Sequence, residues 1–156
     1  MKNNSPVSLV LTERGIPHEE FQHEHAPNSL EQAAEERSQR PEQIVRSILF
    51  RCARGEYVMV LIAGPQQIDW KSLRQYVGRS RITMASKEEV LSVTGFELGA
   101  VAPFGLPRPL RVLVDMSVFG EEEISMGSGA RGVAVMLKST DLMKALGDVE
   151  IVNLSG

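Results

Sequence analysis

The chain of 156 residues contains one cysteine, Cys52, and therefore has no second thiol for an internal disulfide. A single cysteine also excludes zinc sites built from paired cysteines. Lack of disulfides is typical of proteins kept in a reducing compartment, so we expect a cytoplasmic protein. Cys52 lies in an apolar strand pattern, where a cysteine is more often a small buried hydrophobe than a nucleophile.

Long hydrophobic runs are absent as well. One of the longest, residues 58–63, is far shorter than the stretch of about 18 apolar residues that crosses a bilayer. The first residues, M-K-N-N-S-P, lack the apolar stretch of a secretory signal. The sequence therefore predicts neither a membrane span nor a membrane partner.

Positive charge is not in excess, because 17 Lys and Arg face 20 Asp and Glu, which gives a net charge of −3. Such a chain cannot hold a long duplex by neutralising many phosphates, so DNA is not an expected partner. A local cleft that binds one or two nucleotides is compatible with this charge.

Repeats, low-complexity segments and linkers are also missing, so we expect one domain over residues 1–156. The patterns predict helices at 6–14, 29–40, 69–77, 86–93 and 141–146, and strands at 19–25, 44–52, 56–63, 81–85, 110–115, 123–126 and 133–138. Ala53-Arg54-Gly55 is predicted to close a hairpin. Because strands and short helices alternate irregularly, the expected class is α+β, with a central mixed, strongly curved sheet flanked by short helices.

The segment Gly127–Gly132 (G-S-G-A-R-G) satisfies the dinucleotide motif G-x-G-x-x-G letter for letter. That motif must follow a strand and open a helix, whereas the β-branched run Val133–Leu137 follows here and predicts a strand. We therefore expect a turn between two strands and no dinucleotide cofactor. Backbone amides of such a turn can still form a nest for an anion.

Arg46 shares its predicted strand face with Ile44, Ile48 and Phe50, because residues of like parity lie on one face. An unpaired buried charge is costly. Arg46 should therefore either form a buried ion pair or line a cleft that holds an anion. Parity alone does not decide between the two.

The histidines are His18, His23 and His25. His23 and His25 share a strand face, but no third ligand completes a metal site, so surface histidines and no metal are expected.

The glycine- and proline-rich segment Thr94–Pro109 predicts a loop. Glycine allows close approach of the backbone to a ligand, so Gly99 and its neighbours can aim N–H groups at a carbonyl oxygen, as an oxyanion hole requires. A purely structural loop fits the same residues.

Four segments resemble the YbaK/prolyl-tRNA-synthetase-associated editing domain family. Thr94–Gly105 is similar to its signature T-G-[YF] followed by G-x-x-x-P-[FL]-G, and Ile124–Gly132 to its second glycine-rich strand–turn–strand. His25–Ala34 is similar to its histidine–proline turn and alanine-rich helix, and residues 141–142 to its closing helix. The segments occur in the family's order over nearly the whole chain, which makes the resemblance far more specific than any single motif.

The resemblance implies an α+β domain that hydrolyses the ester of mischarged aminoacyl-tRNA in trans. No cofactor is expected. It points to tRNA for proline carrying a wrong small amino acid, with alanine, cysteine, serine and threonine all in range. The expected partners are the acceptor end of aminoacyl-tRNA and a prolyl-tRNA synthetase.

One departure from the family concerns its functional lysine, which stands in a strand V-[VF]-K-[TN]-L. Residues 45–49 read V-R-S-I-L, so Arg46 occupies the lysine position. Arginine keeps the charge and can hold a phosphate through two hydrogen bonds, but it cannot shift its pKa as lysine can. The alternative function is therefore a non-catalytic module that binds aminoacyl-tRNA or a synthetase.

By this resemblance, backbone groups from Gly99 to Pro103 surround the substrate carbonyl, Arg46 binds the terminal phosphate or ribose, and residues 127–129 shape the other wall. No side chain is an evident general base, which favours assistance by the free ribose hydroxyl. The predicted catalytic residues are Arg46, Gly99 and Ala100. The predicted substrate-binding residues are His25, Ser47, Val101, Pro103, Gly127, Ser128 and Gly129.

Overall fold

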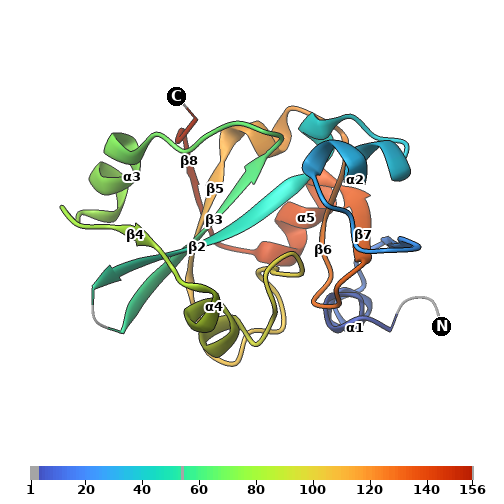
Figure 1. Ribbon diagram of the computed structural model, residues 1–156, viewed down its shortest axis with the longest axis horizontal. Coiled ribbons are helices and arrows are strands. Elements are labelled where there is room, and N and C mark those ends of the chain that lie inside the picture. Colours follow the sequence, from blue (N-terminus) through green and yellow to red (C-terminus); the bar gives the residue numbers. More distant parts are fainter. Residues whose placement is uncertain (1–3, 54, 156) are drawn as a thin grey trace.

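The computed structural model describes residues 4–53 and 55–155, and its strands form two sheets (Figure 1). The strands are β1 (Glu19–Gln22), β2 (Val45–Ala53), β3 (Glu56–Ala63), β4 (Thr83–Met84), β5 (Arg111–Asp115), β6 (Glu123–Gly127), β7 (Val133–Lys138) and β8 (Glu150–Val152). The helices are α1 (Pro6–Glu13), α2 (Leu30–Glu36), α3 (Trp70–Val77), α4 (Lys87–Thr94) and α5 (Ser139–Leu146), with 3₁₀ turns at Pro41–Gln43 and Met116–Phe119.

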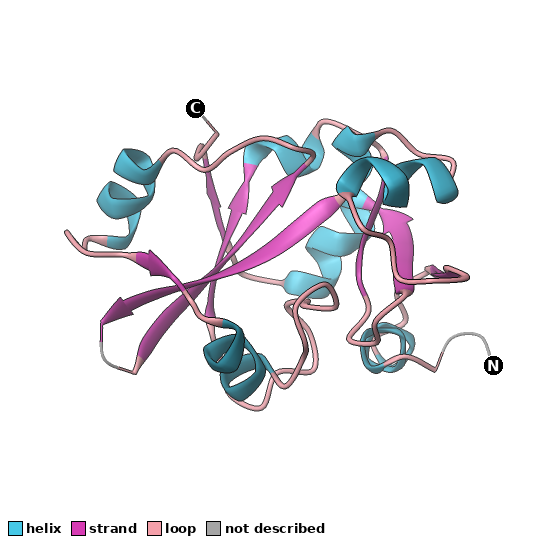
Figure 2. Ribbon diagram, viewed as in Figure 1, coloured by secondary structure: helices cyan, strands magenta, loops and turns pink. Residues whose placement is uncertain are grey.

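The larger sheet has the order β4-β2-β3-β5-β8. β2 pairs antiparallel with β3 and β4, whereas β3–β5 and β5–β8 are parallel, so this sheet is mixed as predicted. β1, β7 and β6 form a separate antiparallel sheet, a division that the sequence does not indicate. A bridge between Ile44 and Ser125 links the two sheets where β2 begins. Figure 2 shows the strands with the helices around them. The α+β class is confirmed.

Local signals at the helix ends act as the sequence predicts. The Ser86 hydroxyl accepts from the Glu89 N–H at 3.1 Å while the Glu89 carboxylate accepts from the Ser86 N–H at 2.8 Å, which is a complete capping box at the start of α4. Ser29 caps α2 by accepting from the Gln32 N–H at 3.0 Å. Gly78 ends α3 with a φ of +78°, a conformation that glycine adopts without steric cost.

The hydrophobic core lies on both faces of β2 and β3. One face carries Val45, Leu49 and Leu61 and packs against α1, α4, α5 and the small sheet. The other carries Phe50 and Ile62 and packs against α3. A strand buried on both faces needs an unbroken apolar sequence, which explains the run in β3. Cys52 is buried on the α3 side, as predicted, and burial raises the pKa of its thiol.

The structure differs from the predicted elements at several ends. β4 spans two residues rather than five, and β8 has no counterpart in the prediction. β8 is only three residues long, and a contact beyond its end anchors it. The Leu154 N–H, two residues after β8, donates to the buried Asp115 carboxylate at 2.6 Å. The predicted turn residue Arg54 lies outside the described residues. No helix in the described part of the chain is long and apolar enough to cross a membrane.

Candidate functional site

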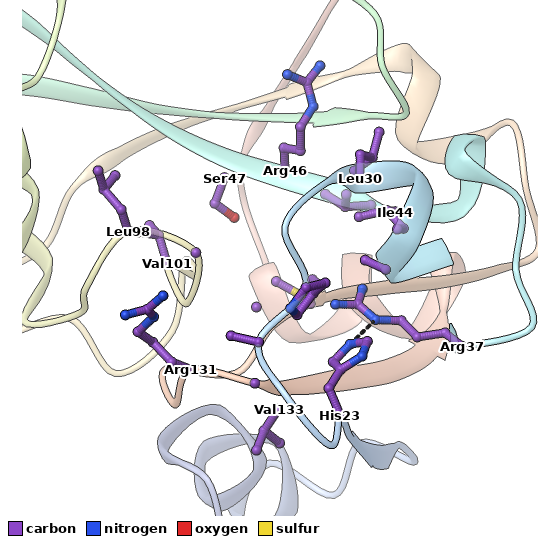
Figure 3. A pocket seen from close by; sticks show the side chains of 18 of the residues that line it. His23, Leu30, Arg37, Ile44, Arg46, Ser47, Leu98, Val101, Arg131 and Val133 are labelled. Carbon is purple, nitrogen blue, oxygen red and sulfur yellow. Dashed lines mark hydrogen bonds between the residues drawn. The ribbon is translucent and has the colours of Figure 1, made fainter. Parts of the chain in front are cut away.

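A pocket of about 360 Å³ opens between α2, the start of β2, residues 98–101 and the β6–β7 turn (Figure 3). Five of the predicted site residues line it, namely Arg46, Ser47, Gly99, Val101 and Gly127. Segments far apart in the sequence, such as those of Arg46 and Gly127, therefore meet at one site. The placement depends on β2, which carries Arg46 and Ser47 to the edge of the small sheet.

The charge of this pocket contrasts with that of the whole chain. Its lining includes Arg37, Arg46 and Arg131, and no Asp or Glu is present among the lining residues that the structure describes. The whole chain has a net charge of −3. The concentration of cations at one hollow favours an anionic ligand there.

Arg46 and Ser47 are neighbours in the sequence but point to opposite sides of β2 (Figure 3). As parity predicts, Arg46 lies on the face of Ile48 and Phe50. Its guanidinium donates to the backbone carbonyl of Gln66, and burial lowers its pKa. Among the described residues Arg46 forms no ion pair, so the buried ion pair considered from the sequence is not found.

Ser47 faces the pocket from the other side of the strand. Its hydroxyl oxygen is buried and has no hydrogen-bond partner among the described residues. A buried polar atom without a partner costs about 1–3 kcal/mol. A substrate oxygen or nitrogen would remove that cost by hydrogen bonding to Ser47.

The loop before Ala102 lines the pocket with Leu98, Gly99 and Val101. Gly99 has a φ of +90°, and no protein atom lies within 4 Å of the position a Cβ would take there. Gly99 and Val101 line the pocket, and neither amide N–H has a partner in the described residues. Ala100 between them is buried, and its N–H donates to the backbone carbonyl oxygen of Glu97 at 3.0 Å.

The β6–β7 turn lies against this loop. A Cβ on Gly127 would stand 2.4 Å from the Val101 carbonyl oxygen, so only glycine allows the two backbones to approach this closely. Ser128 is fully buried, and its hydroxyl donates to the Val133 carbonyl at 2.7 Å within the turn. β7 starts at Val133, so the prediction of a strand rather than a helix after the motif is confirmed.

Two pocket residues that the sequence reasoning missed are Arg37 and His23. The Arg37 Nε donates to His23 Nε2 at 3.0 Å, and its Nη1 donates to the Ser125 hydroxyl at 2.9 Å. His23 Nδ1 in turn contacts the Glu36 carboxylate at 2.6 Å. The sequence did contain a signal for Arg37. It lies one helical turn after the buried Ala33 and therefore faces the same side of α2.

The remaining predicted site residues lie outside the pocket lining. His25 is exposed, Ala100 and Ser128 are buried, Gly129 lies beside Pro6 and Phe96, and Pro103 lines a different groove. The expectation of surface histidines is wrong for His23, which is 5% exposed. In the part of the chain that the structure describes, no group of three or more His, Cys, Asp or Glu is placed to hold a metal ion.

Comparisons with known proteins agree with this architecture. A solved structure described as a candidate trans-editing enzyme for prolyl tRNA synthetase superimposes with a TM-score of 0.87 at 25% identity, over 97% of this chain and 95% of that one. The uncharacterized protein YwhH of Bacillus subtilis (strain 168) is 34% identical over 114 residues, which is 73% of this chain and 72% of that protein.

Two relatives carry functional names. The multifunctional Ser/Thr-tRNA deacylase ProXp-y of Escherichia coli (strain K12) is 31% identical over 100 residues, 64% of this chain and 59% of the deacylase. A proline–tRNA ligase of Kosmotoga olearia is 37% identical over 78 residues, half of this chain but 13% of the ligase. The model of the aminoacyl-tRNA editing domain matches residues 23–145, and the chain therefore belongs to the aminoacyl-tRNA editing domain family.

Proposed function

We propose that this protein hydrolyses, in trans, the ester that joins a wrongly attached amino acid to the terminal ribose of a tRNA. The observation that carries the proposal is the meeting, at one cationic pocket, of the two unpartnered amides of Gly99 and Val101 with the unpartnered hydroxyl of Ser47. Membership of the editing family supplies the reaction class.

The proposed role of Gly99 and Val101 is to stabilise the oxyanion. Attack of water on the ester carbonyl places negative charge on its oxygen, and two N–H donors aimed at that oxygen lower the barrier. The Ala100 N–H already donates to the backbone carbonyl oxygen of Glu97. We therefore assign the donors to residues 99 and 101, and we assign to Ala100 the support of the loop.

The proposed nucleophile is a water molecule. Water adds to the carbonyl carbon, the carbon–oxygen bond to the ribose breaks, and the ribose oxygen takes up the proton that the water loses. His23 is not free to act as the base, because Nδ1 contacts Glu36 and Nε2 accepts from Arg37. The neighbouring ribose hydroxyl is therefore our candidate for orienting the water.

The proposed substrate is tRNA for proline carrying a small wrong amino acid. A pocket of about 360 Å³ must hold the ester and part of the terminal nucleoside, which leaves room for residues such as alanine, cysteine, serine or threonine. Arg46, at the pocket edge, would contact a phosphate or ribose of the acceptor strand. A prolyl-tRNA synthetase in the cytoplasm is the proposed partner that supplies tRNA selectivity.

A non-catalytic binding module remains the second candidate, and it is favoured by Arg46 at the position of the family lysine. The deciding experiment charges tRNA for proline with alanine, cysteine, serine, threonine and proline, and measures first-order loss of each ester. Faster loss of at least one wrong ester than of prolyl-tRNA supports the deacylase. Tight binding with no acceleration on any ester would overturn it in favour of the module.

A further inference from the structure

Arg37 is a cation fixed inside the pocket wall at the end of α2 (Figure 3). Two of its three nitrogens are used, Nε by His23 at 3.0 Å and Nη1 by Ser125 at 2.9 Å. Nη2 has no partner among the described residues, and it is not among their buried unpartnered atoms either. The guanidinium is therefore held on one side, with Nη2 left for a ligand.

Among the described residues, no carboxylate forms a close ion pair with Arg37. The acceptors on its Nε and Nη1 are an imidazole nitrogen and a hydroxyl, both uncharged in this arrangement. The adjacent Glu36 binds His23 through one oxygen and Gln32 through the other, at 2.6 Å and 2.9 Å. Burial lowers the pKa of Arg37 to about 10, and the negative charge of nearby Glu36 offsets only part of this effect.

His23 and Glu36 hold this cation in place. Because Nε2 of His23 accepts from Arg37, its Nδ1 carries the proton and donates to Glu36. The Ser125 hydroxyl accepts the hydrogen bond from Arg37 and donates its own hydrogen bond to Gln39 Oε1 at 2.7 Å. A guanidinium fixed by such contacts is a preorganised receptor for an oxyanion.

If the ligand is the end of an aminoacyl-tRNA, as proposed, its charged groups determine which of them can bind to Arg37. An aminoacyl ester has lost the carboxylate of its amino acid, and its α-ammonium would be repelled by a guanidinium. The anions that remain near the ester are the phosphodiesters of the acceptor strand, the nearest being the one at the 5′ position of the terminal adenosine.

We propose that Arg37 binds the 5′-phosphate of the terminal nucleotide and thereby fixes the direction in which the substrate enters the pocket. The nucleotide phosphate lies on the α2 side, and the ester lies across the pocket beside Gly99, Val101 and Ser47. This direction keeps the α-ammonium away from Arg37. The proposal rests on the proposed function, which it deepens by naming the contact that orients the substrate.

The test measures how strongly Arg37 and the phosphate depend on each other. The probes are 3′-amino-3′-deoxyadenosine carrying alanine through an amide that cannot be hydrolysed, and the 5′-monophosphate of the same compound. Dissociation constants for both are measured by calorimetry with the full chain.

The variants are Arg37→Met, Arg37→Lys, Ser125→Ala and the control Arg40→Met, with a melting curve for each. Arg40 is a matched control because it is exposed, follows α2 closely and does not line the pocket.

We expect the unmodified protein and the Arg40→Met variant to bind the phosphorylated probe about tenfold or more tightly than the other probe, the usual effect of a hydrogen bond to a charged group. Arg37→Met should bind both probes equally. Arg37→Lys should keep part of the preference, because lysine keeps the charge but lacks the planar guanidinium with its several fixed N–H donors. Ser125→Ala should reduce the preference without abolishing it.

Three results would overturn the proposal. An unchanged phosphate preference in Arg37→Met would place the phosphate elsewhere. Equal weakening of both probes in a folded Arg37→Met variant would mean a structural role only. Arg37-dependent binding of an aspartyl probe without phosphate would mean a site for a side-chain carboxylate.

An Arg37-dependent phosphate preference in a protein that cleaves no charged tRNA would refute the proposed hydrolysis alone, whereas cleavage without the preference would refute only this orientation.

Discussion

The Gly129 N–H donates a 2.9 Å hydrogen bond to the Ala100 carbonyl oxygen and so joins the two glycine-rich segments of the chain. Beside this bond, the backbone of Gly127 lies against that of residues 100 and 101. The loop that carries the unpartnered amides of Gly99 and Val101 is therefore supported directly by the β6–β7 turn.

The first prediction tests that close approach. Gly127→Ala would place a Cβ 2.4 Å from the Val101 carbonyl oxygen, so the loop or the strand must move. We expect a loss of about 1–3 kcal/mol in the free energy of unfolding and a large drop in deacylation. Gly120→Ala is the control, because its Cβ would meet nothing nearer than 3.4 Å. Full stability of Gly127→Ala in urea denaturation would contradict the contact.

The second prediction concerns Gly99. An alanine there would push its methyl group toward the substrate and strain a residue at φ +90°. We expect deacylation to fall by about 10²-fold, the effect of losing one oxyanion contact. Gly78→Ala carries similar strain at φ +78° far from the pocket, so it should match the stability loss and keep full activity. Equal rates for the two variants would make the Gly99 loop a scaffold.

Arg46 gives the third prediction. Since Arg46 forms no ion pair in the described residues, Arg46→Ala should leave the free energy of unfolding unchanged or slightly higher while deacylation falls sharply. Arg46→Lys should retain activity if only charge is needed and lose it if a two-pronged phosphate contact is needed. Melting curves are measured beside rates. A loss of about 3–5 kcal/mol with activity per folded molecule retained would contradict the proposed role of Arg46 in catalysis.

The fourth prediction compares two serines. Ser47→Ala removes an unpartnered buried hydroxyl, so stability should stay level or rise by about 1 kcal/mol while KM for the substrate increases. Ser128→Ala removes a hydroxyl that bonds the Val133 carbonyl, so it should cost about 1 kcal/mol and leave KM unchanged. The opposite pattern in the two variants would exchange their roles.

The fifth prediction is a pH dependence of stability. The hydrogen bond from His23, together with that from Gln32, holds the pKa of Glu36 below its usual value of 4.5. A depressed carboxyl pKa contributes stability that is present above the unfolded pKa and is lost as pH falls through the folded one. Glu36→Gln should therefore be less stable than the unmodified protein at neutral pH, and the gap should close as the pH falls below 4.5 and through the lowered pKa of Glu36. Glu35→Gln, on the exposed side of α2, is the control. A gap in melting temperature that persists at low pH would contradict this account.

Much of the architecture follows from local signals. The Ser86–Glu89 capping box, the apolar run of β3 and the strand parity of Arg46 are properties of neighbouring residues, and each determines its element wherever that element is placed. The glycine-rich loop and turn are local too, because the conformations and close approaches they permit depend on missing side chains.

The site itself required the tertiary structure. The sequence predicts neither the division of the strands into two sheets nor the burial of His23, because both depend on which distant segments pack together. It also assigned to Arg46 alone the cationic role that we propose Arg37 shares. Arg37 looks like an ordinary polar helix end, and only its contacts with His23 and Ser125, which lie 14 and 88 residues away, turn it into a fixed charge in the pocket. Local chemistry determined which elements form, whereas long-range packing decided which side chains meet.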